Sequence, residues 1–170
     1  MTDTQDTIQG ILRKAYQIEV DGYTFYSMAA DRADKEAVQE LFEKLASDEV
    51  QHKAYLKNVM SVYEDRGVEA FNVNRRDPDL AAFSATIFTD KFKKQAAGAS
   101  FELGVLSIGM TLETNAIQYF TGAAKSAGDD EVRGFYEYLA DWEKLHYEAL
   151  QNLHDQVRQD FWSDTGFSPF

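Results

Sequence analysis

The chain has 170 residues, a length typical of one domain, and its 44% apolar residues are enough to form a substantial core. Its net charge of −12 argues against nucleic-acid binding, because phosphates carry the same sign. The absence of cysteine excludes disulfides, thiolate zinc sites, iron–sulfur clusters and a cysteine nucleophile, and fits a cytoplasmic location. The first ten residues are polar and acidic, and no apolar run reaches the length of a membrane span, so we expect no signal peptide and no membrane insertion.

Four long segments carry apolar residues at helical spacing, at about 5–32, 34–65, 98–126 and 129–160, and both prolines lie outside them. Asp34 is the expected N-cap of the second segment and Gly67 its expected stop. Two of the joins are short, which predicts two antiparallel helical hairpins. We expect residues 67–97 to form a long crossover between the hairpins, and residues 161–170 to form an aromatic tail that packs on the bundle or on a second copy. The sequence thus predicts a single all-α domain over residues 1–170, built as a four-helix bundle.

The two predicted hairpins repeat each other in sequence. When the chain is shifted by 94 positions, residues 18–56 align with residues 112–150 without a gap. Identical pairs occur throughout this alignment, among them Val38 with Val132 and Leu45 with Leu139. We therefore expect the hairpins to be related by a pseudo-twofold axis.

Each repeat contains a glutamate, a second glutamate 30 residues later, and a histidine three residues after that. The residues are Glu19, Glu49 and His52 in the first repeat, and Glu113, Glu143 and His146 in the second. Residues three apart share a helix face, so each histidine should project beside the glutamate that precedes it. All four glutamates lie in the middle of apolar stripes, which predicts that they face the core.

Four unpaired carboxylates in a core would be very costly, whereas two divalent cations would neutralise their charge and take one nitrogen from each histidine. One Glu from each of two helices, with Glu-x-x-His from each of the other two, is the ligand set of ferritin-like di-iron carboxylate bundles. This donor set suits two iron ions, and manganese or zinc are possible substitutes. A bundle with buried Glu–His hydrogen bonds and no metal is the alternative.

With these six residues, about residues 5–158 of the chain resemble the rubrerythrin branch of the ferritin-like superfamily. The resemblance implies that Glu49 and Glu143 bridge two iron ions, and that each remaining pair completes the ligands of one iron: Glu19 with His52, and Glu113 with His146. It also implies that all six act in catalysis through the metals, in a protein of oxidative-stress defence that forms a homodimer or a larger homo-oligomer.

Two features depart from the family pattern. The chain has no cysteines for a rubredoxin domain, so electrons would come from a separate donor protein. Ala116 stands three residues after Glu113, where the family usually has a further glutamate, and this favours a simpler, more symmetric site. Tyr26, seven residues after Glu19, points the same way, so its phenol can hydrogen-bond a ligand carboxylate or relay an electron, or simply fill the core. Asp48, directly before Glu49, could orient a ligand histidine, but we expect it at the surface.

These observations favour a non-haem di-iron oxidoreductase that reduces peroxide or dioxygen with electrons from the separate donor. Two alternatives remain open at this point. One is an iron-binding or ferroxidase protein of iron storage or transfer, and the other is a metal-stabilised interaction module without turnover.

Overall fold

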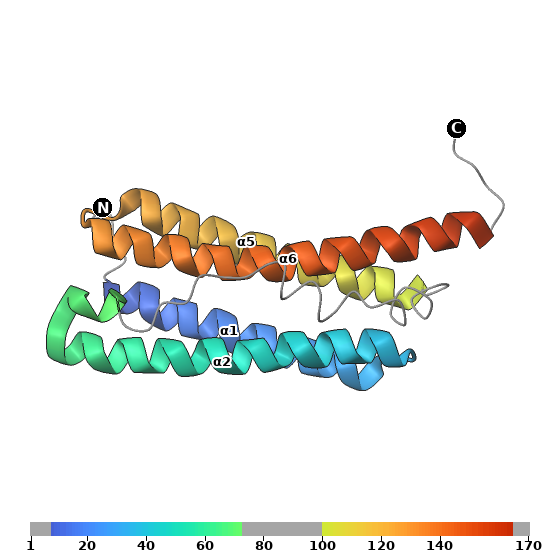
Figure 1. The fold of residues 1–170 in the computed structure, drawn as a ribbon, viewed down its shortest axis with the longest axis horizontal. Coiled ribbons are helices and arrows are strands. Elements are labelled where there is room, and N and C mark those ends of the chain that lie inside the picture. The colour runs from blue at the N-terminus through green and yellow to red at the C-terminus, as the bar shows by residue number, and fades with distance from the viewer. Residues whose placement is uncertain (1–7, 73–99, 165–170) are drawn as a thin grey trace, which may run out of the picture.

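The computed structural model describes residues 8–72 and 100–164, without the side chains of residues 100–102 and 160–164. The described chain is helical: α1 (Ile8–Arg32), α2 (Glu36–Arg66), the 3-10 helix η1 (Gly67–Asn72), α5 (Ser100–Ser126) and α6 (Asp130–Asp164). Figure 1 shows α1 with α2 and α5 with α6 as two antiparallel hairpins that lie along each other. The predicted all-α, ferritin-like bundle is confirmed.

Local chemistry explains where the helices begin and end. Lys35, not Asp34, is the N-cap of α2; it has an extended backbone and no side-chain cap, so the predicted cap was wrong by one residue. Gly67 ends α2 as predicted: its φ of 64° suits glycine, and its N–H donates to the carbonyl of Tyr63. The side chain of Asp129 caps α6 by accepting hydrogen bonds from the second and third N–H groups that follow it, at 2.9 and 3.1 Å.

Two predicted connecting segments differ from the structure where it describes them. Residues 67–72, the start of the predicted crossover, form η1, which buries Ala70 and Phe71 completely. Residues 161–164 of the predicted aromatic tail continue α6, because the next glycine and proline come only at Gly166 and Pro169. The rest of the crossover and of the tail lies outside the described residues.

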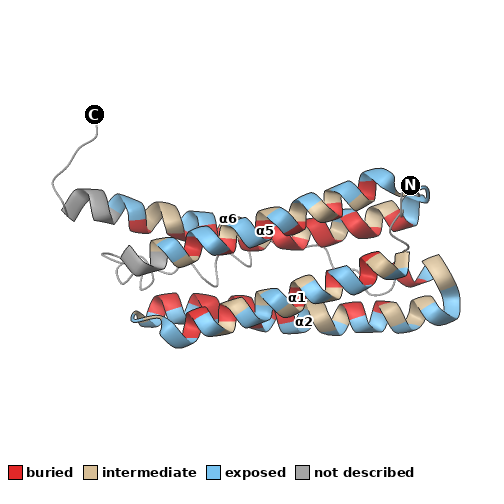
Figure 2. Cartoon of the chain, turned by 180° about the vertical axis from the view of Figure 1, so that it is seen from behind, coloured by how far each residue is buried: buried red, intermediate tan, exposed pale blue. Residues whose placement is uncertain are grey.

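The core consists of two apolar clusters that both draw residues from the two hairpins. One cluster is built around Tyr26, Phe42, Leu106 and Leu150. The other is built around Leu12, Leu56, Phe71, Phe120 and Phe135. In each helix the glutamate of the repeat lies between the stretches that supply these clusters, so the bundle has a polar layer in the middle of an apolar core. Figure 2 shows the buried positions distributed along all four helices. None of the described helices has the length and apolar character that crossing a membrane requires.

Candidate metal centre

The structure brings all six predicted residues together in the buried layer. Their side chains form two groups, in each of which one potential ligand atom per residue lies within 4.8 Å of the others. One group is Glu19, Glu49 and His52, and the other is Glu49, Glu113, Glu143 and His146. Every helix of the two hairpins contributes, and Glu49 belongs to both groups.

In the first group, Nδ1 of His52 lies 3.1 Å from Oε2 of Glu19 and 3.2 Å from Oε2 of Glu49. Glu19 is fully buried, and its other oxygen, Oε1, has no hydrogen-bond partner. Because a buried carboxylate oxygen without a partner is costly, this atom is suited to a cation. His52 is the most accessible of the three, with 12% of its side chain exposed.

In the second group, Nδ1 of His146 lies 3.4 Å from Oε1 of Glu49, 3.5 Å from Glu113 and 3.9 Å from Glu143. The two oxygens of Glu49 therefore face different histidines, as the carboxylate of a bridging ligand must. Glu143, the other expected bridge, joins only the second group, and its Oε1 is a second buried oxygen without a hydrogen-bond partner.

The layer holds protons when no cation is present. Burial raises the pKa of Glu19 to about 8, and burial together with the neighbouring carboxylates raises that of Glu143 well above its usual value. Burial also acts on Glu113, but hydrogen bonds and the charge of His146 outweigh it and lower the pKa of that carboxyl group. Burial alone would lower the pKa of His146, yet the carboxylates of Glu49 and Glu113 raise it well above its usual range. Divalent cations would replace these protons, so the donor set fits iron or manganese.

A tyrosine links the two hairpins at the site. Tyr26 is fully buried on α1, and its hydroxyl donates a hydrogen bond to Oε1 of Glu113 on α5. The phenol thus contacts a carboxylate of the layer, one of the two roles that the sequence suggested. Burial and the carboxylates raise the pKa of Tyr26, so the phenol keeps its proton and acts as a donor.

Two residues at the site were missed from the sequence. The ring of Trp142 stacks on His52 with 4.1 Å between centroids and 8° between planes. Gly22 faces Glu49 so closely that a Cβ would lie 2.6 Å from its Oε1. Two features of the sequence could have indicated them: a tryptophan directly before Glu143, and a glycine inside a long helix, one turn after Glu19.

Asp48 was predicted at the surface, and that prediction was wrong. The residue is only 8% exposed, and its carboxylate forms an ion pair with Lys44, one turn earlier on α2. Because Lys44 balances its charge, Asp48 can be buried directly beside Glu49 without a partner from the two groups.

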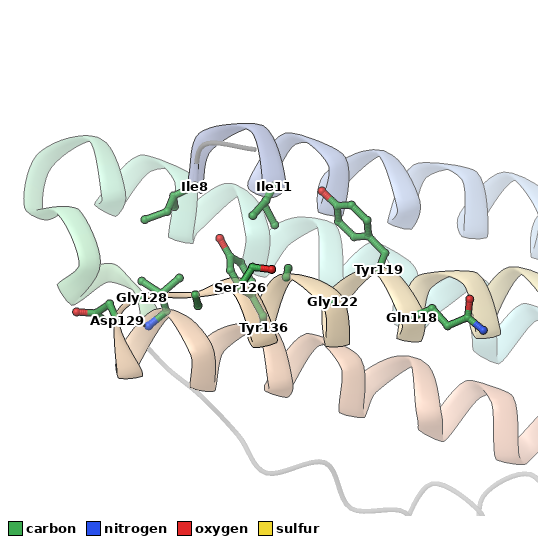
Figure 3. A pocket seen from close by; sticks show the side chains of 12 residues that line it. Ile8, Ile11, Gln118, Tyr119, Gly122, Ser126, Gly128, Asp129 and Tyr136 are labelled. Carbon is green, nitrogen blue, oxygen red and sulfur yellow. Dashed lines mark hydrogen bonds between the residues drawn. The ribbon is translucent and has the colours of Figure 1, made fainter. Parts of the chain in front are cut away.

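Two cavities lie along the seam between the hairpins. The larger, of about 870 Å³, is at one end of the bundle, away from the carboxylates, and is lined by residues such as Ile8, Ile11 and Tyr136 (Figure 3). The smaller, of about 310 Å³, lies between α1 and α5 and reaches three of the carboxylates, those of Glu49, Glu113 and Glu143. Of these two cavities, the smaller is the one that carboxylates of the site line.

One of three kinds of comparison with known proteins found a match. A family model described as rubrerythrin matches residues 10–154, a range that includes all six residues of the two groups. Neither the comparison with curated proteins nor that with solved structures found a match.

Proposed function

The chain belongs to the rubrerythrin family, and on this premise we propose that it is a di-iron oxidoreductase that reduces peroxide or dioxygen with electrons from a separate donor protein. The observation that carries the proposal is the position of Glu49. Its two oxygens face His52 and His146, one in each group, so a single carboxylate joins two potential ion positions.

In this proposal Glu19 and His52 would hold one iron and Glu113 and His146 the other, and Glu49 and Glu143 would serve both. Bound iron would supply the electrons and the Lewis acidity for peroxide reduction. The protein orients the ligands: the hydroxyl of Tyr26 fixes Glu113, and the ring of Trp142 fixes the plane of His52. The apolar clusters on both sides of the layer shield it from bulk water along the length of the bundle.

The chain itself offers no thiolate for a second iron centre, since it contains no cysteine, and this supports electron supply by another protein. A homodimer or larger homo-oligomer, a cytoplasmic location and a role in oxidative-stress defence belong to the same proposal. They rest on the resemblance to the family and on the composition.

The test combines metal content with turnover. Protein purified without added metal is analysed by mass spectrometry, titrated with ferrous ion without oxygen, and mixed with hydrogen peroxide and a chemical reductant. We expect two irons per chain and steady peroxide consumption, both lost in Glu49→Ala. Glu43→Ala, an exposed glutamate two turns earlier on the same helix, is the matched control and should change neither.

Three other outcomes would overturn the proposal in different ways. Ferrous oxidation that ends in stored ferric iron, without repeated peroxide consumption, would make the protein a ferroxidase of iron storage. Tightly held zinc without redox activity would make it a metal-stabilised module. Failure to bind any metal would show that the buried glutamates have another purpose.

A further inference from the structure

We propose that the smaller cavity binds the organic part of an organic hydroperoxide, so that the site reduces R–OOH in which R is a compact apolar group. This inference rests on the proposed peroxide reduction and names its substrate class. It starts from the size of the cavity, about 310 Å³, beside the carboxylates. A water molecule takes up about 30 Å³ of liquid volume, and hydrogen peroxide is little larger, so the cavity offers several times the room that hydrogen peroxide needs.

The buried and the more accessible parts of the cavity differ in chemistry. Its inner end is formed by the carboxylates of Glu49, Glu113 and Glu143, where the O–O group would react.

The middle and the mouth of the cavity suit an apolar body. Ile18 and Leu112 line it from α1 and α5, and Leu112 is 37% exposed, unusual for a leucine beside a buried site. Exposed polar residues lie among its lining too, namely Lys14, Asp21 and Asn115, and they can contact solvent or a polar substituent. Mostly apolar walls with a few polar groups are typical of small-molecule pockets.

Ala116 sets the room inside this cavity. It is 4% exposed, lies one turn after Glu113 on α5 and so shares its face, and lines the cavity beside the carboxylates. Any larger side chain at this position would extend into the space that the organic group needs. Ala116 is therefore the residue that determines the substrate size.

The reaction balances as R–OOH + 2 e⁻ + 2 H⁺ → R–OH + H₂O. The O–O bond breaks, the two electrons come from the separate donor through the site, and the two protons come from solvent. The alcohol leaves through the mouth of the same cavity.

The first experiment compares kcat/KM for cumene hydroperoxide and hydrogen peroxide in the iron-loaded wild type, Ala116→Leu and Ala54→Leu. Ala54 is an exposed alanine on α2 that does not line the cavity, so it controls for the substitution itself. We expect Ala116→Leu to lower kcat/KM for cumene hydroperoxide about tenfold or more, the size of effect that excess methylenes cause in a fitted pocket. The loss for hydrogen peroxide should be clearly smaller, because the smaller molecule needs less of the space that the leucine takes. Equal losses for both peroxides, or none for either, would overturn the proposal.

A second readout does not need turnover. The product alcohol, 2-phenyl-2-propanol, should bind the metal-free and the iron-loaded protein, as measured by ligand-observed NMR. Binding should persist in Ala54→Leu and disappear in Ala116→Leu, with the milder Ala116→Val in between if the leucine variant unfolds. Absent binding to the wild type, or equal binding by both leucine variants, would refute the pocket. If no peroxide is reduced while the alcohol binds as expected, the proposed function fails but the pocket stands.

Discussion

Gly22 occupies a position in the interior of α1 where alanine would normally be preferred. A Cβ there would lie 2.6 Å from Oε1 and 3.0 Å from Cδ of Glu49, whereas ordinary contact begins near 3.4 Å. In Gly22→Ala, therefore, the carboxylate of Glu49 or α1 itself must move by most of an ångström. Because Glu49 faces both His52 and His146, this displacement disturbs both groups at once.

Gly22→Ala should affect metal binding and the stability of the metal-free protein to different extents. Alanine in a helix interior stabilises by about 1 kcal/mol relative to glycine, which offsets the repacking of one flexible carboxylate. Ligand distances in metal sites are held within about 0.2 Å, and loss of a contact that orients a ligand lowers metal affinity about 10- to 100-fold. We expect a loss of about tenfold or more in affinity, or about 1.4 kcal/mol, with little change in the stability of the metal-free protein.

The assay is an anaerobic competition titration with Co²⁺ or Fe²⁺ against a chelator, accompanied by urea unfolding of the metal-free protein. Gly104→Ala is the control, because a Cβ on that exposed α5 glycine meets none of the described atoms within 4 Å. It should raise stability and leave metal affinity unchanged. The reasoning is refuted if Gly22→Ala binds metal as tightly as Gly104→Ala does.

Three further predictions follow from contacts within the site. Tyr26→Phe removes the hydrogen bond to Glu113 and should destabilise the metal-free protein by about 1.5–3 kcal/mol, a typical value for a bond to a charged group; unchanged urea unfolding would contradict it. The pKa of Glu19 is about 8 in the folded protein and near 4.5 in the unfolded chain, so between these pH values the folded metal-free protein binds one more proton than the unfolded chain. Its stability should therefore fall as the pH rises from about 4.5 to 8. A thermal unfolding temperature that rises over this range would disprove this. Trp142 stacks on His52, so metal binding should change its fluorescence; a titration signal of equal size in Trp142→Phe would show that the stack does not report on the metal.

The fold and the approach of the six residues to one another could be predicted because they depend on local rules. Helical spacing of apolar residues needs no knowledge of neighbours, and a repeat of Glu and Glu-x-x-His on apolar stripes has few physical explanations. Gly67 ended α2 as predicted for the same reason, since a positive φ favours glycine whatever surrounds it.

Most of the features that were not predicted depend on contacts between helices, which the sequence of one helix does not reveal. Gly22 is explained only by the approach of Glu49 from α2, and the stack of Trp142 on His52 only by the contact of α6 with α2. Asp48 was misjudged although its ion-pair partner, Lys44, lies one turn earlier on the same helix. The cap of α2 was misplaced by one residue because Lys35 adopts the extended backbone without any side-chain signal.

The repeat is symmetric in its ligands but not in what holds them. Tyr26 donates to Glu113, whereas the residue 94 positions after Tyr26 is Phe120, which has no proton to give, and Glu19 keeps an oxygen without a hydrogen-bond partner. The exchange of one hydroxyl for a hydrogen between the two halves thus makes the two groups of potential ligands chemically different. If two unlike ions bind, they would therefore have one preferred arrangement in this protein instead of two equal ones. The two repeated hairpins therefore differ from each other in a way that the Glu and Glu-x-x-His motif alone does not predict.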